Sequence, residues 1–181
     1  NKTVCFQISY LGTEKPVLDY LRGARMNEIT VRDVISIVAS KALSAYFNDR
    51  YPNYPVFKKP VTKDNQATMR AEAINAIAGK ATQLGTSLLE SLGLLLDGKV
   101  SVEHSKYASH YLSRLAKLPE GGVLNASDIM TSLNGQDMVD SEFKLSVIWT
   151  SVIWTALVYS GNCILVGPDN KRYDASNVEE F

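Results

Sequence analysis

The chain contains 181 residues, of which 45% are hydrophobic and 21% are charged, and its formal net charge is zero. These ordinary values exclude a wholly disordered chain. A neutral chain also has no overall charge that would attract nucleic acid or a membrane surface. The charge is nevertheless uneven, because residues 1–102 carry a net +4 and residues 103–181 a net −4. The length allows one large domain or two small ones.

Three features of the sequence predict a cytoplasmic piece of a longer protein. Cys5 and Cys163 lie far apart and form no motif, which fits a reducing compartment. No signal peptide is visible, and the longest apolar segment, residues 145–159, is too short and too polar to cross a membrane. The chain begins without Met in a strand-like segment, CFQIS, so we expect a fragment of a larger protein.

The first hundred residues predict a helical domain. Its apolar residues recur at three- and four-residue steps, and proline, threonine and glycine stand where helices begin and end. The helices that these signals predict cover residues 17–22, 30–48, 64–79 and 87–95.

Within this domain, residues 46–63 predict a connector, because three prolines exclude both a helix and a central strand. Tyrosines and phenylalanines alternate there with Arg50, Lys58, Lys59 and Lys63. Cations mixed with aromatic rings suit contacts to a phosphate backbone and stacking on bases. The alternative is a rigid connector whose aromatic side chains pack on the helical domain.

Residues 101–181 predict a winged helix-turn-helix-like domain. The predicted order is a helix over 105–117, a short extended piece at 122–125, helices over 126–133 and 143–159, and then a strand, a turn and a strand. The expected fold class is therefore mainly α with a small β-hairpin. A helical domain (1–100) is followed by a winged-helix-like domain (101–181).

The predicted recognition helix does not resemble one that reads DNA. Residues 143–159 contain one lysine and no arginine, whereas a helix in the major groove needs basic side chains. Lys171 and Arg172 at the wing tip are the remaining candidates for a nucleic-acid contact. The repeat SVIWT separates Trp149 from Trp154 by about 140° around a helix. The helix is therefore either buried nearly all round, or one tryptophan belongs to a protein interface.

Residues that would support catalysis are missing from the sequence. There is no phosphate-binding P-loop and no GxGxxG motif. His104 and His110 lie on different faces of one helix and have no ligand-spaced partners, so a metal site is not expected. We predict a non-catalytic chain without a cofactor or metal, whose function is interaction with other molecules.

Four stretches together resemble a known family: FNDRYPNYPVF, LLESLGLLLDGKVSVEHSKYASHYLSRL, GGVLNASDIM and WTALVYSGNCILVGPDNKRYDAS. They are similar to the C-terminal part of PglY-type P-loop ATPases of the bacterial phage growth limitation and BREX defence systems. The resemblance implies a cytoplasmic, multi-protein phage-defence complex as the setting. Its other subunits or domains are then the expected partners. The family's ATPase motifs have no counterpart in this chain, so no catalytic residue is implied, and DNA binding remains the alternative function.

Overall fold

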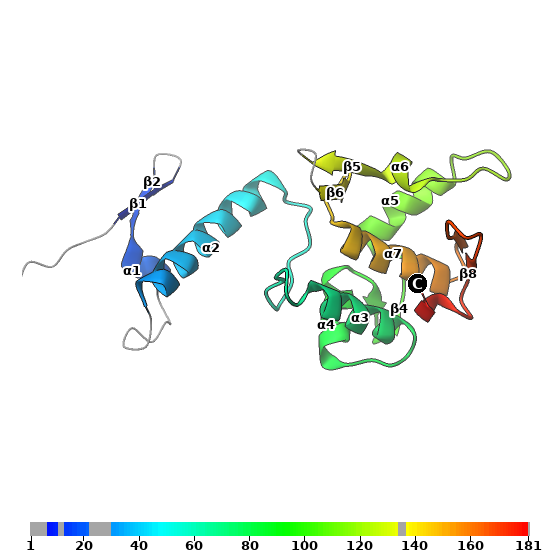
Figure 1. Cartoon of the computed structure of the whole chain (residues 1–181), viewed down its shortest axis with the longest axis horizontal. Coiled ribbons are helices and arrows are strands. Elements are labelled where there is room, and N and C mark those ends of the chain that lie inside the picture. Colours follow the sequence, from blue (N-terminus) through cyan, green and yellow to red (C-terminus); the bar gives the residue numbers. More distant parts are fainter. Residues whose placement is uncertain (1–6, 11–12, 22–29, 134–136, 181) are drawn as a thin grey trace, which may run out of the picture. The chain divides into compact units, whose positions relative to one another are not determined.

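The computed structural model describes residues 7–10, 13–21, 30–133 and 137–180, which form two compact units, Asn1–Pro52 and Asn53–Phe181. The described part is mainly helical, with four separate two-stranded antiparallel sheets (Figure 1). The predicted mainly α class is confirmed. No helix in the described ranges is long and apolar enough to span a membrane.

The first unit combines a hairpin with two helices. Its elements are β1 (Gln7–Tyr10), β2 (Thr13–Pro16), α1 (Val17–Tyr20) and α2 (Val31–Arg50). The sequence predicted both helices but not the hairpin. Of the apolar face predicted for α2, Val38 is buried, whereas Val31 and Ile35 are exposed.

The second unit holds the main core. Its helices are α3 (Gln66–Ile77), α4 (Gln83–Ser91), α5 (Lys106–Leu115), α6 (Ala126–Ile129), α7 (Val147–Tyr159) and the 3-10 helix η1 (Val178–Glu180). Its hairpins pair β3 (Leu95–Leu96) with β4 (Lys99–Val100), β5 (Met130–Leu133) with β6 (Asp137–Asp140), and β7 (Leu165–Val166) with β8 (Arg172–Tyr173).

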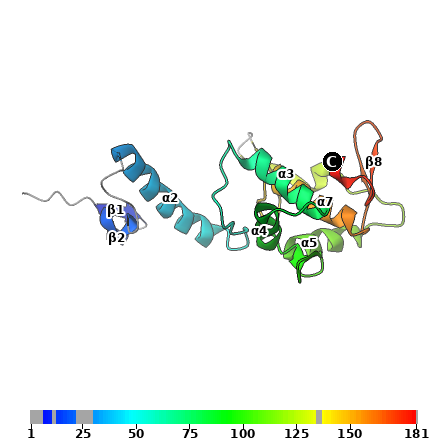
Figure 2. The same ribbon diagram turned by 90° about the horizontal axis from the view of Figure 1, so that it is seen from below.

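Helix α7 is the centre of this core. Every residue from 152 to 158 is buried, because α3, α5, β6 and η1 all pack against the helix. Figures 1 and 2 show α7 running beside α3 in both views. A helix that is apolar on all sides is stable only when it is surrounded in this way. The sequence alternative of a helix buried nearly all round is therefore the one that the structure adopts.

The predicted domain boundary at residues 100 and 101 lies inside the second unit. Helix α3 precedes this boundary and α7 follows it, yet the two helices pack directly on each other. Their buried side chains belong to one hydrophobic core. The change in charge near residue 102 is a change of surface composition, and the compact units instead divide at Pro52 and Asn53.

The winged-helix topology predicted for residues 101–181 is not confirmed. The expected helix over 126–133 ends at Ile129, and residues 130–133 form β5 of a hairpin. The expected first strand, residues 122–125, pairs with no strand, so the sheet of β7 and β8 has two strands. Helix α7 also begins later than expected, because residues 140–144 form a turn closed by the Asp140 carboxylate, which accepts hydrogen bonds from Glu142 N and Phe143 N.

Local signals explain where the helices begin and end. Ser105 precedes α5, and its hydroxyl accepts a hydrogen bond from Ala108 N, as an N-cap does. After α7, Gly161 has φ +73°, and Asn162 N donates to Leu157 O at 3.0 Å. This is the left-handed glycine ending of a helix, and it confirms the break that was predicted after Tyr159.

Helices α3 and α4 approach so closely that only glycine fits at one position. A Cβ atom on Gly85 would lie 2.4 Å from Glu72 O and 2.9 Å from Ala76 Cβ. The nearest atom belongs to the α3 backbone, which a side-chain rotation cannot move. The pairing of the two helices therefore depends on Gly85.

We predict that Gly85→Ala destabilises the protein. Overpacking of this kind costs about 1–3 kcal/mol, whereas alanine's better helix propensity returns at most about 1 kcal/mol. Urea unfolding followed by circular dichroism measures the difference. Gln83→Ala, at an exposed position of the same helix, is the matched control and should stay within about 0.5 kcal/mol of the wild type. Equal stability of the two variants would contradict the close approach.

Candidate functional site

The second unit contains an apolar groove of about 570 Å³. The end of α5, the segment 122–130, one face of α7 and the strand β7 form its walls. Among the described residues, no charged side chain lines it. The lining residues are Leu115, Gly122, Val123, Leu124, Asn125, Ala126, Ile129, Met130, Val147, Thr150, Ser151, Trp154, Cys163, Ile164, Leu165 and Val166.

Trp154 is anchored on the inner side of this groove. Its indole stacks on the Tyr111 ring of α5, with the ring centroids 5.1 Å apart, and it is 8% exposed. Thr150 lies one turn earlier on the same face of α7 and also lines the groove. Trp154 of α7, stacked on Tyr111 of α5, therefore forms part of this side of the groove.

Four apolar side chains on the groove are exposed to solvent. The exposed fractions are 74% for Val123, 52% for Val147, 58% for Ile164 and 61% for Val166. Single exposed apolar residues are common, but several around one concave apolar surface mark a binding site. The groove therefore exposes apolar surface to solvent from several of its walls.

The interface prediction for Trp149 and Trp154 needs correction. Trp149 is 2% exposed and packs on Phe57, with ring centroids 4.4 Å apart. Trp154 is almost as buried. The two indoles point to different sides of α7, as their spacing predicted, but both sides are covered by the same chain. Neither side chain is an exposed docking residue, and Trp154 contributes only the inner wall of the groove.

The hairpin of β7 and β8 forms one edge of the groove. Its register pairs Leu165 with Tyr173 and Val166 with Arg172. The loop is a turn in which Asn170 N donates to Gly167 O at 3.0 Å, and Asn170 has φ +61°. A turn followed by a left-handed residue is a common three-residue hairpin loop, so the strand–turn–strand predicted here is confirmed.

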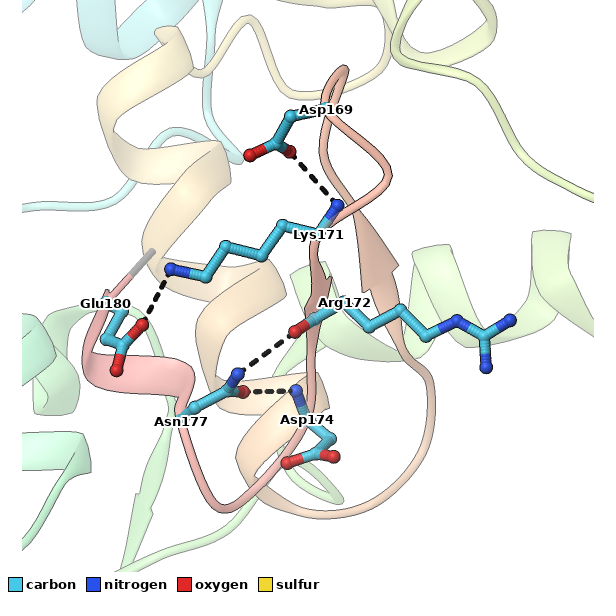
Figure 3. Close-up of polar contacts among 6 residues, drawn as sticks. All are labelled: Asp169, Lys171, Arg172, Asp174, Asn177 and Glu180. Carbon is cyan, nitrogen blue, oxygen red and sulfur yellow. Dashed lines mark hydrogen bonds and ion pairs between the residues drawn. The ribbon is translucent and has the colours of Figure 1, made fainter.

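The two basic residues of this hairpin have different surroundings (Figure 3). Lys171 Nζ lies 2.7 Å from the Glu180 carboxylate, and this hydrogen bond raises the pKa of Lys171. Lys171 also lies over the Tyr173 ring. Arg172 has an exposed side chain that makes no hydrogen bond or ion pair within the described residues, and it points away from Glu180.

The basic and aromatic segment 46–63 is divided between the two units. Arg50 ends α2 and belongs to the first unit, whereas the three lysines belong to the second. Lys58 forms an ion pair with Glu90 at 2.6 Å, and Lys59 and Lys63 are exposed.

The aromatic residues of this segment that lie in the second unit are partly buried. Tyr54 and Phe57 pack against the hydrophobic core. The connector alternative, with aromatic side chains packed on a helical domain, therefore describes residues 53–63 better than a surface for base stacking.

A buried polar cluster lies beside the groove. Asp140 is fully buried, and burial raises the pKa of Tyr111, with the Asp140 carboxylate raising it further. The hydroxyls of Tyr111 and Thr150 find no hydrogen-bond partner of ordinary geometry in the part of the chain that the structure describes. No group of three or more His, Cys, Asp and Glu side chains in the described ranges could hold a metal ion.

Sequence reasoning did not find the groove. It predicted the strand, turn and strand here, but not which of their side chains are exposed. The available signal was the alternation within this strand: a two-stranded hairpin covers one face, so Ile164 and Val166 on the other face must be exposed. The two apolar residues Ile164 and Val166 at outward positions thus indicate an exposed apolar surface on this hairpin.

We predict that Cys163 reacts slowly with alkylating reagents at neutral pH. Burial raises the pKa of its thiol to about 11, and only the thiolate is a good nucleophile. In a Cys5→Ser variant, the iodoacetamide rate measured by mass spectrometry should lie well below that of a free cysteine at pH 8. It should rise as the pH approaches 11. A rate at pH 8 equal to that of the unfolded protein in urea would contradict this environment.

Comparison with known proteins matches both units to one family. Residues 1–51 match the DUF6079 third domain, and residues 66–181 match the 4th domain of this family of unknown function. No curated protein and no solved structure matches the chain. The matched regions also agree with the division of the structure after Pro52. The chain belongs to the DUF6079 family, and it spans the third-domain and fourth-domain regions of that family.

Proposed function

We propose that residues 53–181 are a non-catalytic docking module that binds another protein through the apolar groove. The observation that carries this proposal is the ring of exposed side chains at Val123, Val147, Ile164 and Val166 around a groove without charged lining. Covering these side chains removes apolar surface from water, which is the main driving force of protein association.

The polar groups of the groove also favour binding over chemistry. The Ser151 hydroxyl donates to Ile148 O and accepts a hydrogen bond from Arg70 Nε, each at 2.8 Å. The raised pKa of Cys163 keeps its thiol protonated at neutral pH. A nucleophile needs a nearby base or a lowered pKa, and these groups have neither.

The proposed partner is another domain or subunit of a phage-defence ATPase assembly. The resemblance to PglY-type ATPases of BREX and phage growth limitation systems supports this setting. The family matches support it as well, because a third and a fourth domain imply relatives with further domains. Within such a protein, the apolar groove would hold the C-terminal module against its neighbour.

DNA binding is the less favoured function. Residues 53–181 contain 12 lysines and arginines against 14 aspartates and glutamates, a net charge of −2. Lys58 and Lys171 are each paired with a glutamate. A surface that binds duplex phosphates needs several unpaired cations close together, and these pairs reduce the number available.

We predict that the groove contacts one specific protein segment in the cell. A photoreactive benzoylphenylalanine placed at Val123 or Val166 of the full-length protein should cross-link to a single partner segment, which mass spectrometry identifies. Val56 is 75% exposed and lies outside the groove, so the same probe at Val56 is the matched control and should give no such product.

Binding of the purified partner then tests the contact directly. Val123→Asp should weaken it about tenfold or more, because a charge would enter an apolar interface, and Val56→Asp should leave it unchanged. Groove positions that cross-link no more than position 56 would contradict the docking function. Salt-dependent binding of duplex or single-stranded DNA at low ionic strength would support the alternative instead.

A further inference from the structure

We infer that the partner binds as an extended strand along the free edge of β7, with apolar side chains in the groove and a carboxylate beside Val166, on the face that also carries Arg172. This inference rests on the proposed docking function and adds the conformation and the chemistry of the partner.

No strand of the described residues pairs with the outer edge of β7. The hairpin is a two-stranded sheet, so β7 has a neighbour on one side only. Gly167 N donates to Lys171 O at 2.8 Å, and antiparallel ladders alternate between hydrogen-bonded and non-hydrogen-bonded pairs. Leu165 and Tyr173 are therefore the next hydrogen-bonded pair. The backbone N–H and C=O of Val166 point outward, where an added strand can bind them.

An added strand would continue the sheet over the groove. Its side chains on the inner face would lie on the same face of the sheet as Leu165, which packs against the core and lines the groove. Its side chains on the outer face would lie beside Val166. Apolar residues at alternate positions of the partner would thus cover the groove, while the outer positions remain near the rim.

The side chains at this edge are not of the kind that protects strand edges from pairing. Natural edges commonly carry charged side chains or proline. Here Ile164 and Val166 place apolar side chains at the outward positions, and both are more than half exposed. Pro168 comes only after β7, in the loop. The short length of β7 limits such pairing to a few residues, so the groove must supply part of the affinity.

The charge on this face of the hairpin selects a partner with a carboxylate. Arg172 lies directly opposite Val166 in the hairpin, on the same face. Lys171 already has Glu180 as a partner, whereas Arg172 has none within the part of the chain that the structure describes. An arginine beside an apolar surface that becomes covered attracts a carboxylate more strongly than one in open water.

A library of displayed ten-residue peptides tests this inference on the full chain. Selected peptides should alternate apolar and other residues and contain an aspartate or glutamate. The dissociation constant of a selected peptide is then measured by fluorescence anisotropy. Arg172→Glu should weaken binding about tenfold, and a peptide with lysine in place of its acidic residue should restore it.

Two further measurements identify the binding mode. Methylating the peptide backbone amides at alternate positions should abolish binding in one register and be tolerated in the other, because only one set of amides faces β7. A helical ligand would not show this alternation. Lys99→Glu reverses a charge on β4, in a different hairpin outside the groove, and is the matched control that should leave binding unchanged.

The outcomes separate this inference from the docking function. Peptides whose binding depends on Val166 but responds neither to Arg172→Glu nor to amide methylation would overturn strand addition and leave docking intact. A library without any Val166-dependent peptide would also overturn strand addition. The absence of a cross-linked partner at Val123 and Val166 would overturn docking itself.

Discussion

The complete burial of α7 is the constraint on which the second unit depends. From residue 152 to 158 every side chain is withdrawn from water, so this helix cannot rest on one surface as an amphipathic helix does. Other helices and strands of the chain must therefore cover α7 on every side. Helix α3 covers one side, α5 another, and the C-terminal segment returns along the helix as η1. This requirement joins residues before and after position 100 in one core, in spite of their different charge.

The covering of α7 is incomplete at its first turns, and this is why a groove exists. Val147 is half exposed, whereas Trp149 is almost fully buried. The segment 122–130 and the hairpin of β7 and β8 stand on either side without closing the gap. Apolar surface beside α7 therefore remains accessible, next to the edge of β7 that no described strand covers. Docking of a partner would complete the enclosure that the chain begins.

Sequence patterns predicted the helices and turns that have strong local signals. They predicted less of how these elements pack together. The glycine after α7 and the turn between β7 and β8 were found because backbone conformation limits which residues stand there. The hairpin of β5 and β6 was missed, since residues 130–133 continue an apolar pattern that fits a helix or a strand equally well. The groove was also missed. It depends on which side chains the tertiary packing leaves exposed, and neither periodicity nor composition reports that.

The repeated SVIWT has a mechanical consequence. A helix that is buried on all sides has no polar face that would fix its rotation about its own axis. The two indoles remove that freedom, because Trp149 meets Phe57 on one side while Trp154 meets Tyr111 on another. Turning α7 by one residue, about 100°, would displace both rings at once. The two tryptophans therefore fix the rotation of α7, and with it the position of the groove wall to which Trp154 belongs.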